Sequence, residues 1–275
     1  MNAAGESSAR RGRADLHIHT LASDGTASVS DILDAVAAAG RLDVIAITDH
    51  ERIDAAIAAR HLAQDRGLPF QVVVGEEITT RGGHLLGLFL EHRVPPLKSL
   101  RWSIEAVHDQ GGIAIPAHPL VPLHLSAQGW ALRGLLDDDN PLVHPDALET
   151  FNPTAIGRYG HGRAVAFADE RGLARIGSSD AHAIEAIGSA WTTFDGRTGD
   201  DLRRAIAEGT TAHDGGFHGS MGQLAVFGRQ LRKRGRDAKA EVAGRIRRDG
   251  SGRDHGYPGS TRRPPVFDPR DGTRR

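Results

Sequence analysis

The sequence of 275 residues contains no cysteine. This absence excludes a disulfide framework, a thiolate nucleophile and a cysteine-ligated zinc site, and it is compatible with a reducing cytoplasm, where we expect the protein to reside. The sequence also has no apolar run long enough to cross a membrane. Its first residues lack the apolar core of a secretory signal. We therefore expect neither membrane insertion nor secretion.

The charges nearly cancel, since 34 lysines and arginines stand against 35 aspartates and glutamates and leave a formal net charge of -1. That balance neither favours nor excludes a nucleic-acid partner. The distribution is uneven, because the chain becomes strongly basic after about residue 228. A hydrophobic fraction of 39% is enough for a sizeable core, and the length suits one large α/β domain or two small ones.

The composition divides the chain into three segments. Residues 1–13 are small, polar and basic, which predicts a disordered leader, and residues 14–219 carry the expected folded domain. Residues 220–275 start with a partial helical spacing that glycines interrupt and continue into a glycine-, proline- and arginine-rich stretch typical of disorder. Such a basic tail can attract RNA or another polyanion; the alternative is a solvated extension without a partner.

Apolar strand-like runs alternate with helical patterns through the middle segment. Residues 42–47 are almost continuously apolar, as expected for a strand of a parallel sheet that is buried on both faces. Similar runs occupy residues 14–19, 70–74, 84–90, 113–115, 147–151 and 174–177, and helical patterns fall near 28–39, 53–66, 97–110, 162–171 and 200–208. This alternation predicts an α/β fold with parallel strands. No G-x-G-x-x-G follows the first strand, so the pattern does not favour a dinucleotide-binding sheet.

The first strand ends in His17-Ile18-His19, and Asp24 follows in the next loop. Alternate side chains of a strand point to the same face, so the two imidazoles are expected to project together. Two imidazoles and a carboxylate at a strand end suit a divalent metal. An isolated His-x-His is more often a pair of ordinary surface or core histidines.

Further ligand-type side chains fall mainly at later strand ends, where a β/α barrel builds its active site. They are His50, Glu77, His84, His118, Asp180 and His182. Each has a simpler explanation: His84 as an exposed strand start, His118 as a turn residue before a proline, Asp180 as a helix cap. Gathered at one rim, however, such groups destabilise a fold unless a cation neutralises them.

The order H-x-H, S-D-G, I-T-D-H, G-x-E, H, A-H-P and S-D-A-H, from about residue 14 to about residue 215, resembles the PHP family, named for polymerases and histidinol phosphatases. The resemblance implies a distorted (β/α)7 TIM-like barrel with up to three metals at the carboxyl ends of the strands. It implies one metal on His17, His19, Glu77 and Asp180, a second bridged by Glu77 and completed by His84 and His118, and a third on Asp24, His50 and His182. The G-x-E-I-T register selects Glu77 over Glu76 as the bridging carboxylate.

The resemblance also implies a metal-dependent phosphoesterase. Every expected ligand position is filled, which disfavours a purely structural member of the family. Because the chain has no cysteine and no serine in a nucleophile-elbow pattern, we expect direct attack by a metal-bridging hydroxide without a covalent intermediate. Histidine and carboxylate ligands suit manganese, iron or zinc equally.

Four more residues receive expected roles. Arg158, which follows the sixth strand, is expected to bind the phosphate with its guanidinium, the alternative being a solvated loop arginine. His161 is a candidate to protonate the leaving oxygen, and His213 is a second candidate. Asp49 is expected to orient a ligand histidine rather than to bind metal.

The expected substrate is a small phosphate mono- or diester, with nucleotides and oligonucleotides among the candidates. Relatives that degrade RNA often carry a helical insertion between the positions of His84 and His118, and this chain does not. Residues 120–146, with Trp130 and Arg133, are therefore the expected cover of the substrate. Two alternatives stay open: an amidohydrolase-like enzyme, which often bridges its metals with a strand lysine, and a non-catalytic, metal-stabilised module that binds polyanions.

Overall fold

The structure is a computed structural model that describes residues 11–122 and 125–217. The first ten residues of the expected leader and the whole basic tail, residues 220–275, lie outside the described residues. All described residues belong to the first of two units into which the chain divides, Met1–Arg234.

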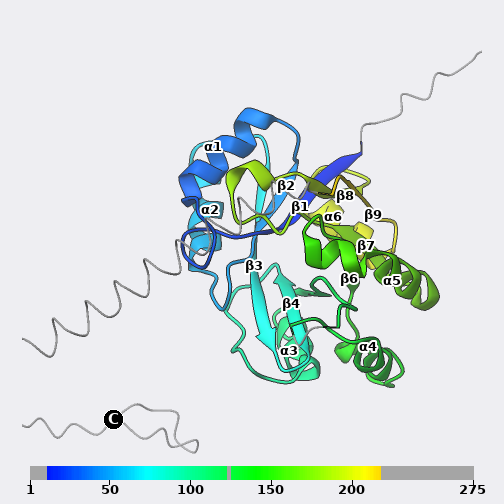
Figure 1. Cartoon of the computed structure of the whole chain (residues 1–275). Coiled ribbons are helices and arrows are strands. Elements are labelled where there is room, and N and C mark those ends of the chain that lie inside the picture. Colours follow the sequence, from blue (N-terminus) through cyan, green and yellow to red (C-terminus); the bar gives the residue numbers. More distant parts are fainter. Residues whose placement is uncertain (1–10, 123–124, 218–275) are drawn as a thin grey trace, which may run out of the picture. The chain divides into compact units, whose positions relative to one another are not determined.

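Seven strands form one curled sheet in the order β5-β4-β3-β2-β1-β8-β9, and β6 pairs separately with β7 (Figure 1). The strands are β1 (Gly12–Ile18), β2 (Val44–Ile47), β3 (Gln71–Thr80), β4 (Gly83–Leu88), β5 (Ile113–Pro116), β6 (Ala147–Phe151), β7 (Ala174–Gly177), β8 (Ala190–Phe194) and β9 (Ala212–Gly215). The first strand starts two residues earlier than expected, so the last two residues of the expected leader belong to it. The α/β class is confirmed, whereas a closed (β/α)7 barrel is not.

Strand directions are mixed. The pairs β1–β2, β2–β3 and β6–β7 are parallel, as predicted. The pairs β3–β4, β4–β5 and β1–β8 are antiparallel, so the expectation of an all-parallel sheet is wrong there. The reason at β3–β4 is the two-residue turn Arg81-Gly82, which is too short for the crossover helix that a parallel connection needs.

Four of the six described α-helices begin at a side chain that caps them. The six are α1 (Val29–Ala39), α2 (Asp54–Asp65), α3 (Leu100–His108), α4 (Gly129–Leu136), α5 (Ala155–Arg171) and α6 (Gly199–Ala207), with short 3-10 turns at Pro141–Val143 and Ile184–Ala186. Ser28 and Thr198 form capping boxes at α1 and α6, and Gly40 ends α1 with a φ of 58°. None of the described helices is long and apolar enough to cross a bilayer.

The helix α5 begins seven residues earlier than the pattern predicts. Thr154 caps it by accepting a hydrogen bond from the Gly157 amide. Two of its glycines are needed for close packing, because a Cβ at Gly157 would lie 2.3 Å from the Asn152 carbonyl oxygen and one at Gly160 would lie 2.7 Å from that of Pro119. Tertiary packing therefore overrides the low helix propensity of glycine.

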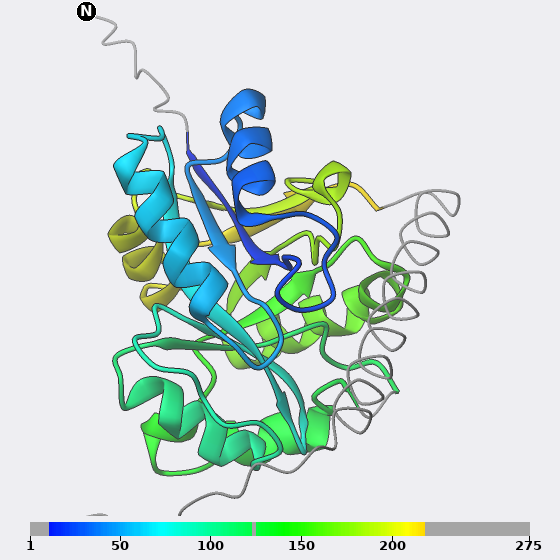
Figure 2. The same cartoon turned by 90° about the vertical axis from the view of Figure 1, so that its left-hand side faces the viewer.

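The sheet separates two hydrophobic cores. Within β2, Ile45 and Ile47 pack outward with the outer helices, among them α1 and α2 (Figure 2), while Val44 and Ala46 face the inside of the curl. The inner core also contains Leu202, Ala205 and Ile206, so one face of α6 fills it. This arrangement explains why the strand is apolar at every position.

Replacing Leu202 by alanine is expected to lower the free energy of unfolding by about 2–5 kcal/mol, because it opens a cavity in the inner core. Leu202 is fully buried. Arg204→Ala on the exposed face of the same helix is the matched control and is expected to cost about 1 kcal/mol or less. Urea unfolding followed by circular dichroism measures both; equal losses would contradict the inner-core position of α6.

Candidate metal centre

His17 and His19 point toward the same side of β1, and a register shift in the strand decides which side that is. Leu16 still faces the inner core, but the pairing with β2 shifts register between Asp15 and Ile18, and Ile18 joins the outer core. A bulge of this kind re-aims the side chains that follow it. The two imidazole rings lie together, with centroids 5.0 Å apart and both side chains fully buried.

The carboxylate of Glu77, on β3, is surrounded by imidazoles. Its Oε2 lies 3.1 Å from His17 Nε2, 3.2 Å from His19 Nε2 and 3.4 Å from His50 Nε2, and its Oε1 lies 2.6 Å from His84 Nδ1 and 3.2 Å from His118 Nε2. An isolated bridge between His50 and Glu77 extends the parallel β2–β3 pairing to this point. Five histidines from separate parts of the chain thus meet at one glutamate.

Two aspartates complete the group. Asp180 Oδ1 lies 3.6 Å from His17 Nε2 and 3.5 Å from His19 Nε2. Asp24 Oδ1 lies 3.1 Å from His182 Nε2 and 3.8 Å from His50 Nε2. The structure therefore brings together all nine ligand-type residues predicted from the sequence, called here the nine-residue cluster: His17, His19, Asp24, His50, Glu77, His84, His118, Asp180 and His182.

The nine-residue cluster fits divalent metal ions. Three subsets have ligand atoms within 4.8 Å of one another: His19, Asp24, His50 and His182; His17, His19 and Glu77; and His50, Glu77 and His84. Nε2 of His17 and of His19 and Nδ1 of His84 are buried, and among the described residues they make no well-aligned hydrogen bond, although Glu77 oxygens lie 2.6–3.2 Å away. A buried polar atom in that situation is costly, and a cation that accepts its lone pair removes the cost.

Electrostatics at the cluster favour ionised carboxylates. Burial alone would raise the pKa of Glu77 and of Asp180. The positive charge of the nearby His17 outweighs burial and holds both pKa values well below normal. Burial would likewise lower the pKa of His19, yet the nearby carboxylates of Asp180 and Glu77 raise it to about 10. Protons and metal ions therefore compete for the same nitrogens.

A small cavity of about 140 Å³ opens onto the cluster. Besides cluster residues, it is lined by Leu125, Ser126 and Ile156. The expected covering segment, residues 120–146, thus reaches the cavity through Leu125 and Ser126. Neither Trp130 nor Arg133 lines it; Arg133 instead forms an ion pair with Glu170 at 3.0 Å.

The structure does not bring Arg158 and His161 to the cluster. Both lie on α5 rather than on a loop, and neither lines the small cavity. The Arg158 guanidinium stacks 5.2 Å from the ring centroid of Phe217, and His161 Nδ1 donates to the Thr150 carbonyl at 2.8 Å. His213 bonds to the Thr150 hydroxyl at 2.8 Å. The catalytic roles expected for these side chains stay predictions, and their contacts do not favour them.

Asp49 organises the loop that follows β1. Its Oδ1 accepts from the Thr20 amide at 2.8 Å and its Oδ2 from the Thr20 hydroxyl at 2.7 Å. It also accepts from the Ser23 hydroxyl, which lies 3.5 Å from His19 Nδ1. Asp49 therefore acts on a cluster histidine through Ser23, which is a less direct contact than we predicted.

The sequence interpretation missed Glu149 on β6. Its side chain is fully buried and lies 3.0 Å from His17 Nδ1. The signal that marks it is a carboxylate in an otherwise buried strand, since such a group needs buried partners. Glu149 is therefore part of the surroundings of the cluster.

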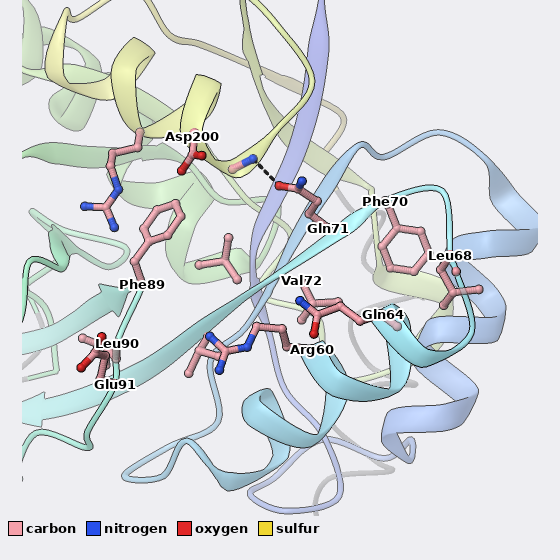
Figure 3. Close-up of a pocket in the computed structure, with 16 residues that line it drawn as sticks. Arg60, Gln64, Leu68, Phe70, Gln71, Val72, Phe89, Leu90, Glu91 and Asp200 are labelled. Carbon is pink, nitrogen blue, oxygen red and sulfur yellow. Dashed lines mark hydrogen bonds between the residues drawn. The ribbon is translucent and has the colours of Figure 1, made fainter.

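A larger cavity, of about 660 Å³, lies beside the first half of β3 (Figure 3). Phe70, Gln71 and Phe89 line it together with Arg60 of α2 and Asp200 of α6. Gln71 Oε1 accepts a hydrogen bond from the Gly199 amide at 2.6 Å, drawn as the dashed line. No member of the nine-residue cluster lines this cavity, so we do not place the chemistry there.

The sequence model of a family described as PHP-associated matches residues 158–211. An uncharacterized protein of Methanocaldococcus jannaschii is 36% identical over 122 residues, which are 40% of this chain and 70% of that protein. A solved two-domain protein of Bacteroides vulgatus, described as containing a predicted PHP-like metal-dependent phosphoesterase, has a TM-score of 0.61 and 20% identity over 80% of this chain and 70% of that one. The chain belongs to the PHP domain family. The motif-based recognition is therefore confirmed.

Part of this PHP domain also resembles a curated enzyme. A phosphoribosyl 1,2-cyclic phosphate 1,2-diphosphodiesterase of Eggerthella lenta is 35% identical over 92 residues, 31% of this chain and 34% of that enzyme. The match spans only a third of that enzyme, so its activity is not transferred whole. At the level of the family, these likenesses indicate a hydrolase.

Proposed function

We propose that this PHP domain hydrolyses phosphate esters at the nine-residue cluster with divalent metals bound. The observation that carries the proposal is the position of Glu77, a single buried carboxylate within 3.4 Å of five imidazole nitrogens. Such a concentration of buried ionisable groups does not stabilise the fold by itself, whereas a metal site requires it.

We assign the ligands to as many as three ions, following the family pattern. His17, His19, Glu77 and Asp180 would hold one ion; Glu77, His84 and His118 a second; Asp24, His50 and His182 a third. The ions, of manganese, iron or zinc, would supply activated water and neutralise the charge that develops on the phosphoryl group.

The side chains around the cavity would position the substrate and exclude water from it. Leu125 and Ile156 form apolar walls of the cavity over the cluster, and such walls strengthen the electrostatic interactions inside it. We propose a small phosphorylated substrate, with a diester as the first class to test, because the Eggerthella lenta relative is named for diester cleavage.

The rival readings predict different features. An amidohydrolase-like enzyme often bridges its metals with a strand lysine, but the lysine within residues 11–217, Lys98, precedes α3 and places its Nζ 5.6 Å from the ring centroid of Trp102. A non-catalytic module would not need every ligand position filled. Both readings are therefore less well supported than a phosphoesterase.

Chelator-treated protein reloaded with manganese, iron(II) or zinc is expected to hydrolyse at least one member of a panel of phosphate mono- and diesters. His50→Ala is expected to lower that rate by at least about a hundredfold, since it removes a ligand of the proposed metal centre. His50 is 28% exposed, so its loss should spare the fold. His61→Ala, at an exposed imidazole on α2, is the matched control and should keep the rate. Turnover of amides with no turnover of any phosphoester would favour the amidohydrolase alternative.

A further inference from the structure

Glu149 is an acidic residue in the middle of β6, a strand whose five residues are all buried. Its side chain has no solvent exposure. A carboxylate placed there must be stabilised by hydrogen bonds, because ionised groups are costly to bury without partners. The partners of Glu149 therefore indicate what the residue does.

Each oxygen of Glu149 accepts two hydrogen bonds. Oε1 accepts from His17 Nδ1 at 3.0 Å and from the Ser178 hydroxyl at 2.5 Å. Oε2 accepts from the His118 backbone amide at 2.6 Å and from Asn152 Nδ2 at 3.2 Å. An ionised carboxylate has about four acceptor positions, so these four donors fill them.

Two of these donors, His17 Nδ1 and the His118 amide, belong to cluster residues. A third donor, Asn152, contacts the cluster residue Asp180. The same Asn152 Nδ2 lies 3.2 Å from Asp180 Oδ2. His118 has a φ of 29°, which is unusual for a residue with a side chain, and the Glu149 hydrogen bond to its amide holds it there. One carboxylate thus contacts the ends of β1, β5 and β7 at the point where they carry cluster residues.

We propose that Glu149 is a positioning residue that sets the metal affinity of the nine-residue cluster, an inference that rests on the proposed metal centre. By accepting the proton of His17 Nδ1, it leaves the lone pair on Nε2, the atom that faces Glu77. By accepting from the His118 amide, it fixes the backbone that aims the His118 ring at Glu77.

Glutamine at position 149 tests this role because it changes hydrogen bonding with little change in size. Its amide NH2 must face either the His17 and Ser178 side or the His118 and Asn152 side, and both sides offer donors. Facing His17, it would favour the tautomer with the proton on Nε2, which removes the lone pair from the cluster. Facing His118, it would push a backbone donor away.

Glu149→Gln is expected to weaken zinc binding by about 10- to 100-fold, the usual effect of removing the partner of a ligand histidine. The measurement is competition with a chromophoric chelator. Ser178→Ala is the matched control, because it removes a donor to the same oxygen without touching a cluster residue, and its zinc affinity should stay within about threefold of the parent chain. Equal affinities for Glu149→Gln and the parent chain would overturn the proposal.

Nitrogen-15 NMR of the zinc-loaded parent chain supplies a readout that needs no variant. We expect His17 to carry its proton on Nδ1; a proton on Nε2 would overturn the proposal even if Glu149→Gln does not fold. Both readouts concern binding. A chain that binds zinc as expected but hydrolyses no phosphoester would refute the proposed function and leave the role of Glu149 intact.

Discussion

Replacing Glu77 by glutamine is expected to lower metal-dependent phosphoester hydrolysis by at least about a thousandfold, the scale on which loss of a buried electrostatic stabiliser acts. Glu77 is the carboxylate that touches His17, His19 and three further histidines. Glutamine keeps the size but removes the negative charge and introduces an NH2 donor that repels a metal ion. Bound metal per chain, measured by plasma mass spectrometry, should fall with the rate.

Glu76→Gln is the matched control for this experiment. Glu76 is the adjacent residue on the same strand, and its Oε2 accepts from the Val94 amide at 2.7 Å rather than from a cluster residue. Burial raises the pKa of Glu76 to about 7, so a neutral amide resembles the protonated state that it partly adopts. This variant should keep both the metal and the rate. Equal losses in the two variants would mean that Glu77 has no special role.

Removing the metal is expected to make the stability of the chain fall as pH rises above neutrality. The folded-state pKa of His19 is about 10, against an ordinary value of 6.5. A raised pKa means that its stabilising contribution is complete below pH 6.5 and is lost as pH rises toward 10. The carboxylates behave in the opposite way: the lowered pKa values of Glu77 and Asp180 stabilise the fold above their ordinary range and cease to do so in acid.

Metal binding should reverse this dependence. A metal ion displaces the His19 proton, so the affinity of the chain for the metal increases with pH. The bound metal stabilises the fold by about 2.7 kcal/mol when its free concentration is a hundredfold above Kd. Thermal unfolding at pH 6, 7, 8 and 9, with chelator or with zinc, measures the gap between the two Tm values, and calorimetry in two buffers measures the protons released. A gap independent of pH, with no proton release, would show that metal does not bind at the histidines.

Much of the fold could be predicted because it depends on local patterns. The apolar run of β2 is present as predicted, and the helical patterns near 28–39 and 200–208 form α1 and α6, which Ser28 and Thr198 cap. Strand direction is not local: the run Gly83–Leu88 looks alike in either direction, and only the two-residue turn before it makes β4 antiparallel. The start of α5 was missed because its glycines disfavour a helix, while close packing requires them there.

The candidate site also has residues that the sequence predicts and residues that it does not. The nine cluster residues could be predicted because they fall mainly at strand ends in a recognisable order, and the structure brings them together. Glu149 could not, because a lone glutamate in a strand has no characteristic spacing, and its importance comes from the four donors that folding brings to it. Arg158 and His161 were placed by their sequence distance from a strand end, which carries little information once that segment is helical.

The most direct test of a metal-dependent phosphoesterase at this cluster is a titration of metal into chelator-treated protein during hydrolysis of a phosphodiester and a phosphomonoester. We predict no turnover without metal and a rate that rises and saturates with added manganese, iron(II) or zinc on at least one of the two esters. Full turnover of metal-free protein, or no turnover of either ester by protein shown to carry its metals, would contradict the account.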